Sequence, residues 1–483
     1  MKSMKEVFRI CLLAACVAVS ASCNPKNKII EDPQSVNKWV HTTMQEHYLW
    51  ASFMPAAVKG DMDVPTDIYF NSLRYRADLS VSDYSHDTYG DRFSKITYTG
   101  SSSRSYDILT DEYSATERVF DFGLVVRFVK ADERVIYCQV LYVLKDSPAD
   151  QKGIKRGDIF NAVSGRKMPF DVSTYNALMN TNKVTLDVVF PEERKRTVAI
   201  SKGYYYDDPI LFDTIYESSP ATGYLVYNHF HNGNDVGYSD RLKNIFHDFK
   251  ARGVRNLILD LRYNGGGELA NARLLASLIA PRVLLGDTFI YKEYNSSLGD
   301  PDAFTRETFM KTQEVGSLNA DIEALYIITS ANTASASELI IHAFKAIYPS
   351  SNIRVVGRTT TGKNVGGRTI TNHSYLWDLS PITLRIYDRN KVSGYEMGIA
   401  PNFEMDEYSS FGSSSYYLRI GALGDVENER LLNRVMTHYV GYLPMADKTP
   451  MPEPDKHSRA EPHLTFSTSV PDRGLVEEYI VAE

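Results

Sequence analysis

A glycine-rich run in this chain has the residue types that stabilise a negatively charged oxygen during acyl transfer. It reads DLRYNGGGE at 260–268 and follows an apolar stretch. Glycines at a turn between a strand and a helix bring bare backbone N–H groups close to a bound group. Such donors stabilise an oxyanion by roughly 3–4 kcal/mol each. A glycine triplet is also typical of an ordinary tight turn at a helix start, so this run needs support from elsewhere in the chain.

A second run, TSANTASASE at 329–338, offers a nucleophile. It also follows an apolar stretch, and its small residues would let a substrate backbone approach. Ser335 lies where a helix is expected to begin, and the positive end of the helix dipole favours an alkoxide there. Ser335 with Glu338 three residues later also fits a helix capping box. Both roles are compatible, because a neighbouring hydroxyl could cap the helix while Ser335 reacts.

The base for such a serine would be Lys363. A serine hydroxyl is a weak nucleophile without a base, and the chain has no G-x-S-x-G run of the kind that carries a Ser-His-Asp site. A lysine can serve when burial lowers its pKa. Lys363 ends the run TTTGK at 359–363, after a strand expected at 353–357. A lone lysine in a Gly-Thr loop is typically solvated, so its role depends on the two runs above.

The elements that must position these groups alternate between strand and helix from residue 204 to residue 444. Such alternation predicts an α/β core with a mainly parallel sheet, in which functional residues gather at the carboxyl ends of the strands. A helix at 427–439 is expected to close this core. Apolar β-type runs stand at 225–227, 256–260 and 324–328, and helical patterns at 238–251, 268–278 and 336–346.

Two smaller parts precede the core. Residues 32–110 open with a helical pattern and predict a small helical N-terminal domain. Residues 115–203 contain short β-type runs and predict a compact β-rich module. Cys138 lies in one of these runs and is expected to be a buried small side chain. The Pro-rich and charged residues from 445 to 483 indicate a C-terminal tail, with one more strand possible at 464–470.

The first residues predict export. A basic start and an apolar run at 10–21 fit a signal peptide over residues 1–22. The small residues before Cys23 indicate a bacterial lipoprotein, in which Cys23 carries lipid and anchors the chain to the membrane at the periplasmic or outer-membrane face of the cell envelope. The alternative is a plain secretory signal. The formal net charge of −7 gives no electrostatic footprint for nucleic acid.

Taken in order, these motifs resemble those of the carboxy-terminal processing peptidases, which are tail-specific serine peptidases with a PDZ module. The order is a PDZ-like module, a strand followed by NGGG, a strand followed by TASASE, and a strand followed by GK. The resemblance covers roughly residues 115–440. The leading domain, with YLW at 48–50, resembles that of lipoprotein members from Bacteroidetes-type bacteria. The fold expected is therefore multidomain α+β, with a small helical N-terminal domain, a PDZ-like β-rich module and an α/β peptidase core.

The resemblance implies a role for each motif residue. The nucleophile is Ser335 and the general base is Lys363. The oxyanion donors are the N–H of Ala336 and that of Gly265 or Gly266. The family needs no metal or cofactor, and its substrate is a protein or peptide.

The resemblance also implies a peptide-binding loop in the β-rich module. Backbone N–H groups of Phe122, Gly123, Leu124 and Val125 would hold the terminal carboxylate of a substrate, whose chain end would add to the module as a strand. A module of this kind also occurs in pure binding proteins, so it does not by itself imply catalysis.

One position departs from the family pattern. Members often have a glutamine four residues after the lysine, where it orients the amine, and this chain has Gly367 there. The partner that orients the lysine is therefore open, with Asn364, Arg368 and Thr369 as nearby alternatives.

The hypothesis is a serine endopeptidase that cleaves exported proteins or peptides near unstructured C-termini. The alternative is a non-catalytic envelope lipoprotein that binds peptide tails on the same scaffold. A carbohydrate-handling lipoprotein is a third reading, but no paired-carboxylate motif recommends it. His229 and His231 share one face of a β-type run and could bind a metal ion, yet the spacing shows no third ligand. The sequence therefore predicts no metal site.

Overall fold

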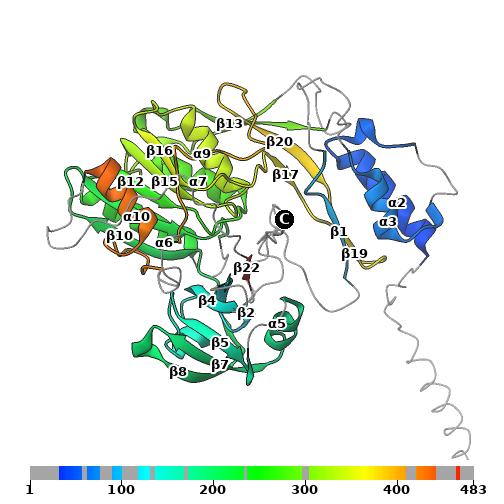
Figure 1. The fold of residues 1–483 in the computed structure, drawn as a ribbon. Helices are drawn as coiled ribbons and strands as arrows, with labels where there is room; N and C mark the ends of the chain where they lie inside the picture. Colours follow the sequence, from blue (N-terminus) through cyan, green and yellow to red (C-terminus); the bar gives the residue numbers. More distant parts are fainter. Residues whose placement is uncertain are drawn as a thin grey trace, which may run out of the picture.

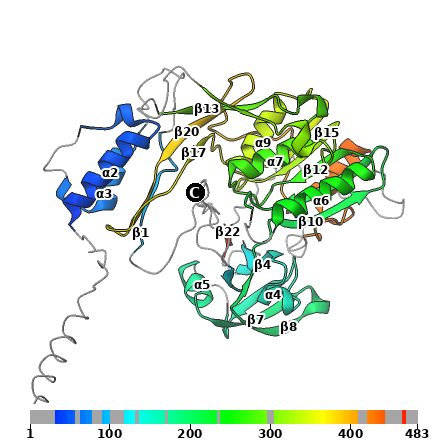
Figure 2. The same ribbon diagram turned by 180° about the vertical axis from the view of Figure 1, so that it is seen from behind.

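The protein is described from a computed structural model that covers residues 32–56, 62–76, 90–99, 118–130, 136–167, 172–232, 237–295, 304–408, 420–441 and 464–467. A central α/β core carries the N-terminal helices on one side and the β-rich module on another (Figures 1 and 2). Cys23 and the signal segment 1–22 lie outside the described residues. Within the described part of the chain, no helix is both long enough and apolar enough to span a membrane.

The core is built on a six-stranded sheet. Strands β11, β12, β15, β16 and β21 pair in parallel, and β10 pairs antiparallel with β11 at one edge. The strands are β10 (Ile210–Tyr216), β11 (Ala221–Tyr227), β12 (Val254–Asp260), β15 (Ala324–Thr329), β16 (Ile353–Gly357) and β21 (Phe403–Glu404). The glycine run begins at the carboxyl end of β12, and the serine run begins at the end of its neighbour β15. Parallel pairing therefore brings the two runs to the same edge of the sheet.

Helices cover both faces of this sheet. Side chains alternate between the faces along each strand, so neighbouring apolar residues enter different layers. Leu257 and Leu259 of β12 pack in the larger apolar cluster with one group of helices, and Ile258 packs in the smaller cluster with α10. The helices of the larger cluster are α6 (Tyr238–Ala251), α7 (Leu269–Ile279) and α9 (Ala336–Lys345), whereas α10 (Arg430–Val435) continues into a π-helical turn at Met436–Val440.

A second, antiparallel sheet extends from the core towards the N-terminal helices (Figure 1). Its strand order is β14-β13-β20-β17. These strands are β13 (Thr288–Tyr294), β14 (Thr305–Thr308), β17 (Val365–Gly367) and β20 (Ile382–Asp388), and the short helix α8 (Thr312–Val315) follows β14. The sequence does not predict this sheet, because its strands are interrupted by polar residues and lie far apart in the chain.

The N-terminal helices pack onto the far end of this extension. Their apolar cluster includes Val40 and Met44 of the first helix and is completed by Val365, Leu379 and Ile382 from the core part of the chain. A three-stranded sheet of order β1-β19-β18 lies beside them. The elements are α2 (Pro33–His47), a 3₁₀ turn at Ala51–Phe53, α3 (Thr66–Leu73), β1 (Lys95–Tyr98), β18 (Ile370–Asn372) and β19 (Trp377–Ser380). The N-terminal helices thus share one core with strands that lie close in sequence to the candidate base.

The β-rich module has its own apolar cluster and one strand from the end of the chain. Its main sheet has the order β22-β3-β4-β5-β7-β8, and β2 pairs separately with β9. Cys138 is fully buried in this cluster, as expected. The elements are β2 (Val119–Asp121), β3 (Leu124–Lys130), β4 (Ile136–Val143), α4 (Pro148–Gln151), β5 (Ile159–Val163), β6 (Arg166–Lys167), α5 (Val172–Met179), β7 (Lys183–Phe190), β8 (Arg196–Ser201), β9 (Gly203–Tyr205) and β22 (Leu464–Ser467).

Candidate active site

The glycine run and the serine run are clamped together through Asn264. The carbonyl oxygen of Asn264 accepts hydrogen bonds from the N–H of Ala334 (3.1 Å) and from the hydroxyl of Ser337 (3.0 Å). Gly266 has a φ of 112°, and a Cβ added there would lie 2.7 Å from the Cβ of Ser335. Only glycine therefore allows this loop to press against the nucleophile candidate.

Ser335 stands at the start of α9 in a strained conformation. Its φ is 59° and its ψ is −116°, in a region that non-glycine residues rarely adopt. Strain of this kind costs on the order of 1–3 kcal/mol and persists only where the surroundings impose it. Only 4% of Ser335 is exposed. The chain thus turns sharply between β15 and α9 and holds Ser335 against the glycine loop.

The candidate oxyanion donors differ in how they are engaged. The N–H of Gly266 donates to the side-chain oxygen of Asn264 at 2.8 Å. Ala336 is the first residue of α9, so its N–H has no acceptor within the helix. The backbone of Ala336 also lies against Gly266, since a Cβ added at Gly266 would be 3.1 Å from the nitrogen of Ala336. The N–H of Gly266 is therefore already engaged within its own loop, and the choice between Gly265 and Gly266 as oxyanion donor stays a prediction.

A buried carboxylate, that of Glu338, joins the serine to the lysine. Its Oε2 accepts the backbone N–H of Ser335 (2.9 Å) and that of Lys363 (2.7 Å). Its Oε1 accepts the N–H of Gly362 (2.6 Å) and the hydroxyl of Thr360. Because the backbone nitrogens of Ser335 and Lys363 donate to the same oxygen atom, the two residues are neighbours in space although 28 positions apart in the sequence.

The environment of Lys363 suits a general base. Burial, helped by the like charge of Lys95, lowers its pKa to about 8, against the opposing pull of Glu338 and Asp91. Burial also raises the pKa of Glu338, and four hydrogen bonds to its carboxylate oppose that shift. Near neutral pH an appreciable fraction of the Lys363 amine is therefore unprotonated and able to accept a proton.

The N-terminal segment at 91–95 lies against Lys363. The ring of Phe93 is centred 5.3 Å from the Nζ of Lys363. Arg92 donates to the carbonyl oxygens of Gly362 (3.0 Å) and Glu396 (2.8 Å). Sequence reasoning missed these residues, because nothing in the spacing connects residue 93 with residue 363.

The three side chains that sequence suggested as orienting partners of the lysine have other contacts. Asn364 donates to Ser393 and Glu396, Arg368 lies against His47, and Thr369 bonds Ser380. Gly367 itself has no room for a side chain, because a Cβ there would lie 2.4 Å from the carbonyl oxygen of Pro381. The glutamine of the family pattern therefore does not fit this backbone.

Arg262, within the glycine run, is part of a network of buried ion pairs. Arg262 bonds Asp260 (2.6 Å), Glu429 (2.7 Å) and Glu407 (2.9 Å). Arg156 of the β-rich module also pairs with Glu407. Burial alone would raise the pKa of Glu407, but the two arginines outweigh it and lower that pKa to about 2.

The network links the β-rich module to the glycine loop. Arg156 donates to the hydroxyl of Tyr263, which belongs to the glycine run, at 2.6 Å. Tyr142 of β4 packs on the same Tyr263 ring, with centroids 5.0 Å apart. A displacement of the module would therefore reach the candidate oxyanion loop directly.

The loop at 122–125, which was predicted to bind a substrate carboxylate, lies at one end of strand β3. The outer edge of β3 is paired with β22. Ser467 of β22 pairs with Val125, and the strand runs antiparallel along β3 to Leu464, opposite Phe128. The N–H of Gly123 donates to the side chain of Asp121 at 2.6 Å. Phe122 is buried. An extended segment can thus add to β3, and residues 464–467 do so here.

Two family models and several known proteins match this chain. The model of Peptidase family S41 matches residues 221–405, and that of the Peptidase S41 N-terminal domain matches residues 35–95. A CtpA-like serine protease of Staphylococcus epidermidis is 26% identical over 253 residues, which cover 50% of this chain and 45% of the relative. A CtpA-like serine protease of Staphylococcus aureus is 24% identical over 300 residues, covering 59% and 54%. The chain thus spans about half the length of these relatives.

A solved structure shares the fold. The S41 protease from Bacteroides fragilis superposes with a TM-score of 0.65 at 23% identity, over 83% of this chain and 97% of that one. The family matches support a serine-type peptidase.

Proposed function

This chain belongs to peptidase family S41, and on that premise we propose that it is a serine endopeptidase in which Ser335 and Lys363 form the catalytic pair. The observation that carries the proposal is the shared carboxylate of Glu338, which receives the backbone N–H groups of both residues. Glu338 thus caps the helix that begins at Ser335 and also holds the loop that carries Lys363, which keeps the two candidate residues in one arrangement.

The chemistry follows from the groups in place. Neutral Lys363 takes the proton of the Ser335 hydroxyl as Ser335 attacks the scissile carbonyl. The oxygen that becomes negative is stabilised by the N–H groups of Gly265 and Ala336. Lys363 then gives the proton to the leaving amine, and an acyl-enzyme remains. Lys363, neutral again, then takes a proton from a water molecule that attacks the acyl group, and it returns this proton to the Ser335 oxygen as the acyl group is released.

Glu338 and Phe93 are positioning residues in this mechanism. Glu338 fixes the backbone on both sides of the reacting pair, and Phe93 covers the Lys363 amine with an apolar ring. Gly367 leaves no space for the orienting glutamine of the family pattern, and the ring of Phe93 is the group that lies against the amine in this chain.

The β-rich module would act as a PDZ-like reader of substrate tails. The edge of β3 accepts an extended segment in antiparallel pairing, which is how such modules bind chain ends. The loop at 122–125 lies where that segment ends. Residues 464–467 occupy the edge in the structure, so a substrate tail would have to displace them.

Export and a lipid anchor at Cys23 complete the proposal. They rest on the apolar run at 10–21 and the small residues before Cys23. The substrates would then be proteins or peptides of the cell envelope, with unstructured C-termini.

The test is proteolysis of an unfolded protein with an apolar C-terminus by the mature chain and by Ser335→Ala and Lys363→Ala. The same substrate with a charged C-terminal extension serves as the tail control. We expect cleavage by the unmodified chain alone, and faster cleavage of the apolar tail. If all three proteins are inert but bind the tail equally, the chain is a binding protein, an alternative that the family match does not favour.

A further inference from the structure

Two histidines and an aspartate come together beside the glycine loop, at the junction of the β-rich module and the core. His229 and His231 follow β11, and Asp207 lies between β9 and β10. One ligand atom from each of the three residues lies within 4.8 Å of the other two. Asp207 stands 22 residues before His229 in the sequence, which is why spacing alone showed no third ligand.

The hydrogen bond of His231 indicates which of its two ring nitrogens is protonated. Its Nε2 lies 2.9 Å from the carbonyl oxygen of Asp207, and a carbonyl only accepts, so Nε2 carries the hydrogen. Nδ1 is then the nitrogen with the lone pair. A metal-binding histidine typically donates its other N–H to a backbone carbonyl in this way.

His229 supplies a second nitrogen close to a carboxylate. Its Nε2 is buried, has no hydrogen-bond partner among the described residues, and lies 3.6 Å from Oδ2 of Asp207. A histidine binds a metal ion through a neutral imidazole. Two neutral imidazoles and one carboxylate are a ligand set typical of zinc.

We propose that Asp207, His229 and His231 bind a divalent transition-metal ion of the zinc class. The two imidazole rings are stacked at 4.2 Å and are parallel within 2°, so binding turns them until their lone pairs meet at one point. A fourth position stays open to water or to an exogenous ligand.

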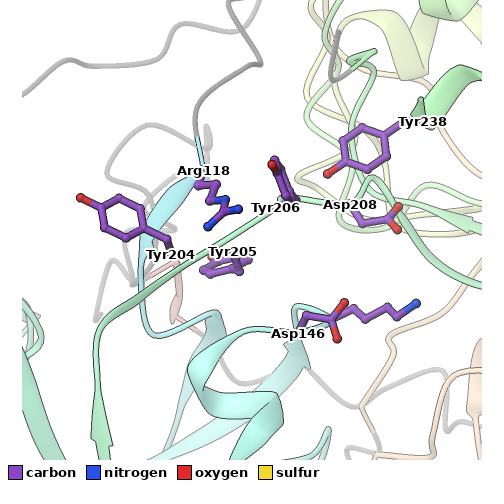
Figure 3. Close-up of a pocket in the computed structure, with 8 residues that line it drawn as sticks. Arg118, Asp146, Tyr204, Tyr205, Tyr206, Asp208 and Tyr238 are labelled. Atoms are coloured by element: carbon purple, nitrogen blue, oxygen red, sulfur yellow. The ribbon is translucent and has the colours of Figure 1, made fainter. Parts of the chain in front are cut away.

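A pocket of about 260 Å³, shown in Figure 3, is lined by Asp208 and Tyr238, which lie beside Asp207 in sequence and His231 in space. Asp208, the neighbour of Asp207, lines the pocket together with Tyr238 and Lys145. The Tyr238 ring also packs edge-on against His231, with centroids 5.1 Å apart.

The ion would link two segments. One is the segment at Asp207 that leaves the β-rich module, and the other is the segment 229–231 that is hydrogen-bonded to the glycine loop. Phe230, between the two histidines, donates its N–H to the carbonyl oxygen of Gly266 (2.8 Å) and accepts the N–H of Glu268 (2.7 Å). Binding would therefore stiffen the segment that supports Gly266. The proposal does not depend on peptidase activity.

The experiment is calorimetric titration of Zn²⁺ into the tag-free chain carrying Ser335→Ala, which prevents self-cleavage. We expect one equivalent to bind, and His229→Ala and His231→Ala each to weaken binding at least 100-fold. His247→Ala, at an exposed position of α6, is the control and should bind as the parent does. His229→Gln, which keeps much of the side-chain volume, replaces His229→Ala if circular dichroism shows that the alanine variant is unfolded.

Absorption spectroscopy with Co²⁺ is a second, independent test of the same site. Co²⁺ in place of Zn²⁺ should show the absorption bands of a tetrahedral ion, and both histidine variants should lose them. If the parent binds neither ion at micromolar concentration, or if the histidine variants bind as tightly as the His247→Ala control, the site does not exist.

Discussion

Two buried charges support the two halves of the candidate site, and their partners differ in kind. Arg262, below the glycine loop, contacts the carboxylates of Asp260, Glu407 and Glu429. Glu338, in α9 beside Ser335, accepts hydrogen bonds from three backbone N–H groups and one hydroxyl, which are all neutral donors. One half is held by ion pairs, and the other by hydrogen bonds from neutral groups to a carboxylate.

The difference matters because the two networks reach different parts of the molecule. Every donor to Glu338 comes from the core, between residues 335 and 363. The Arg262 network crosses into the β-rich module, since Arg156 shares Glu407 with Arg262. The Glu338 hydrogen bonds thus stay within the core, whereas the Arg262 network connects the glycine loop to the module that would bind substrate tails.

Removing Glu338 should have the largest effect. Glu338→Ala leaves three N–H groups and a hydroxyl without their acceptor, and Glu338→Gln points an amide N–H₂ at donors. We expect both variants to lose about 100-fold or more in kcat, because small misplacements of reacting groups cost that much. Steady-state kinetics on a short peptide, with circular dichroism to check folding, measures this. Activity retained by Glu338→Gln would contradict the positioning role.

Removing Arg156 should have a smaller and more selective effect. Arg156→Met takes away the bond to Tyr263 and the pair with Glu407, and Glu407 keeps Arg262 as a partner. We expect a larger loss of kcat/KM for a substrate with a binding tail than for a short peptide without one, by about 5- to 10-fold, which is a typical coupling between sites. Arg156→Lys keeps the charge, and its loss of kcat/KM should lie between those of the unmodified protein and Arg156→Met. Equal losses for both substrates would show that the two regions are not coupled.

The part of the site that sequence predicted well is the part in which neighbours in sequence are also neighbours in space. The runs at 260–268 and 329–338 each continue a core strand, so alternation of strands and helices was enough to place Ser335 beside the glycine loop. Glu338 was predicted as the capping-box partner of Ser335, because it lies three residues after Ser335 at the start of α9. Contacts across long sequence separations were not accessible, since neither periodicity nor spacing reports them. Phe93 against Lys363 and Asp207 beside His229 are both of this kind.

The smallest effect we predict concerns Lys95, whose charge acts on the Lys363 amine in the sense opposite to that of Glu338. Burial is the main cause that lowers the pKa of Lys363 to about 8, and Lys95 adds like-charge repulsion. Only the neutral amine accepts a proton, so kcat/KM should rise as the pH increases through about 8. Lys95→Met removes the repulsion and raises that pKa, so activity at pH 7 should fall, by less than the tenfold that one pKa unit would give. Lys95→Arg keeps the charge and should leave the profile in place. The two profiles should converge above pH 10, where the amine is neutral in either protein. A loss that persists at high pH would mean that Lys95 acts on the structure of the N-terminal segment and not on the charge of Lys363.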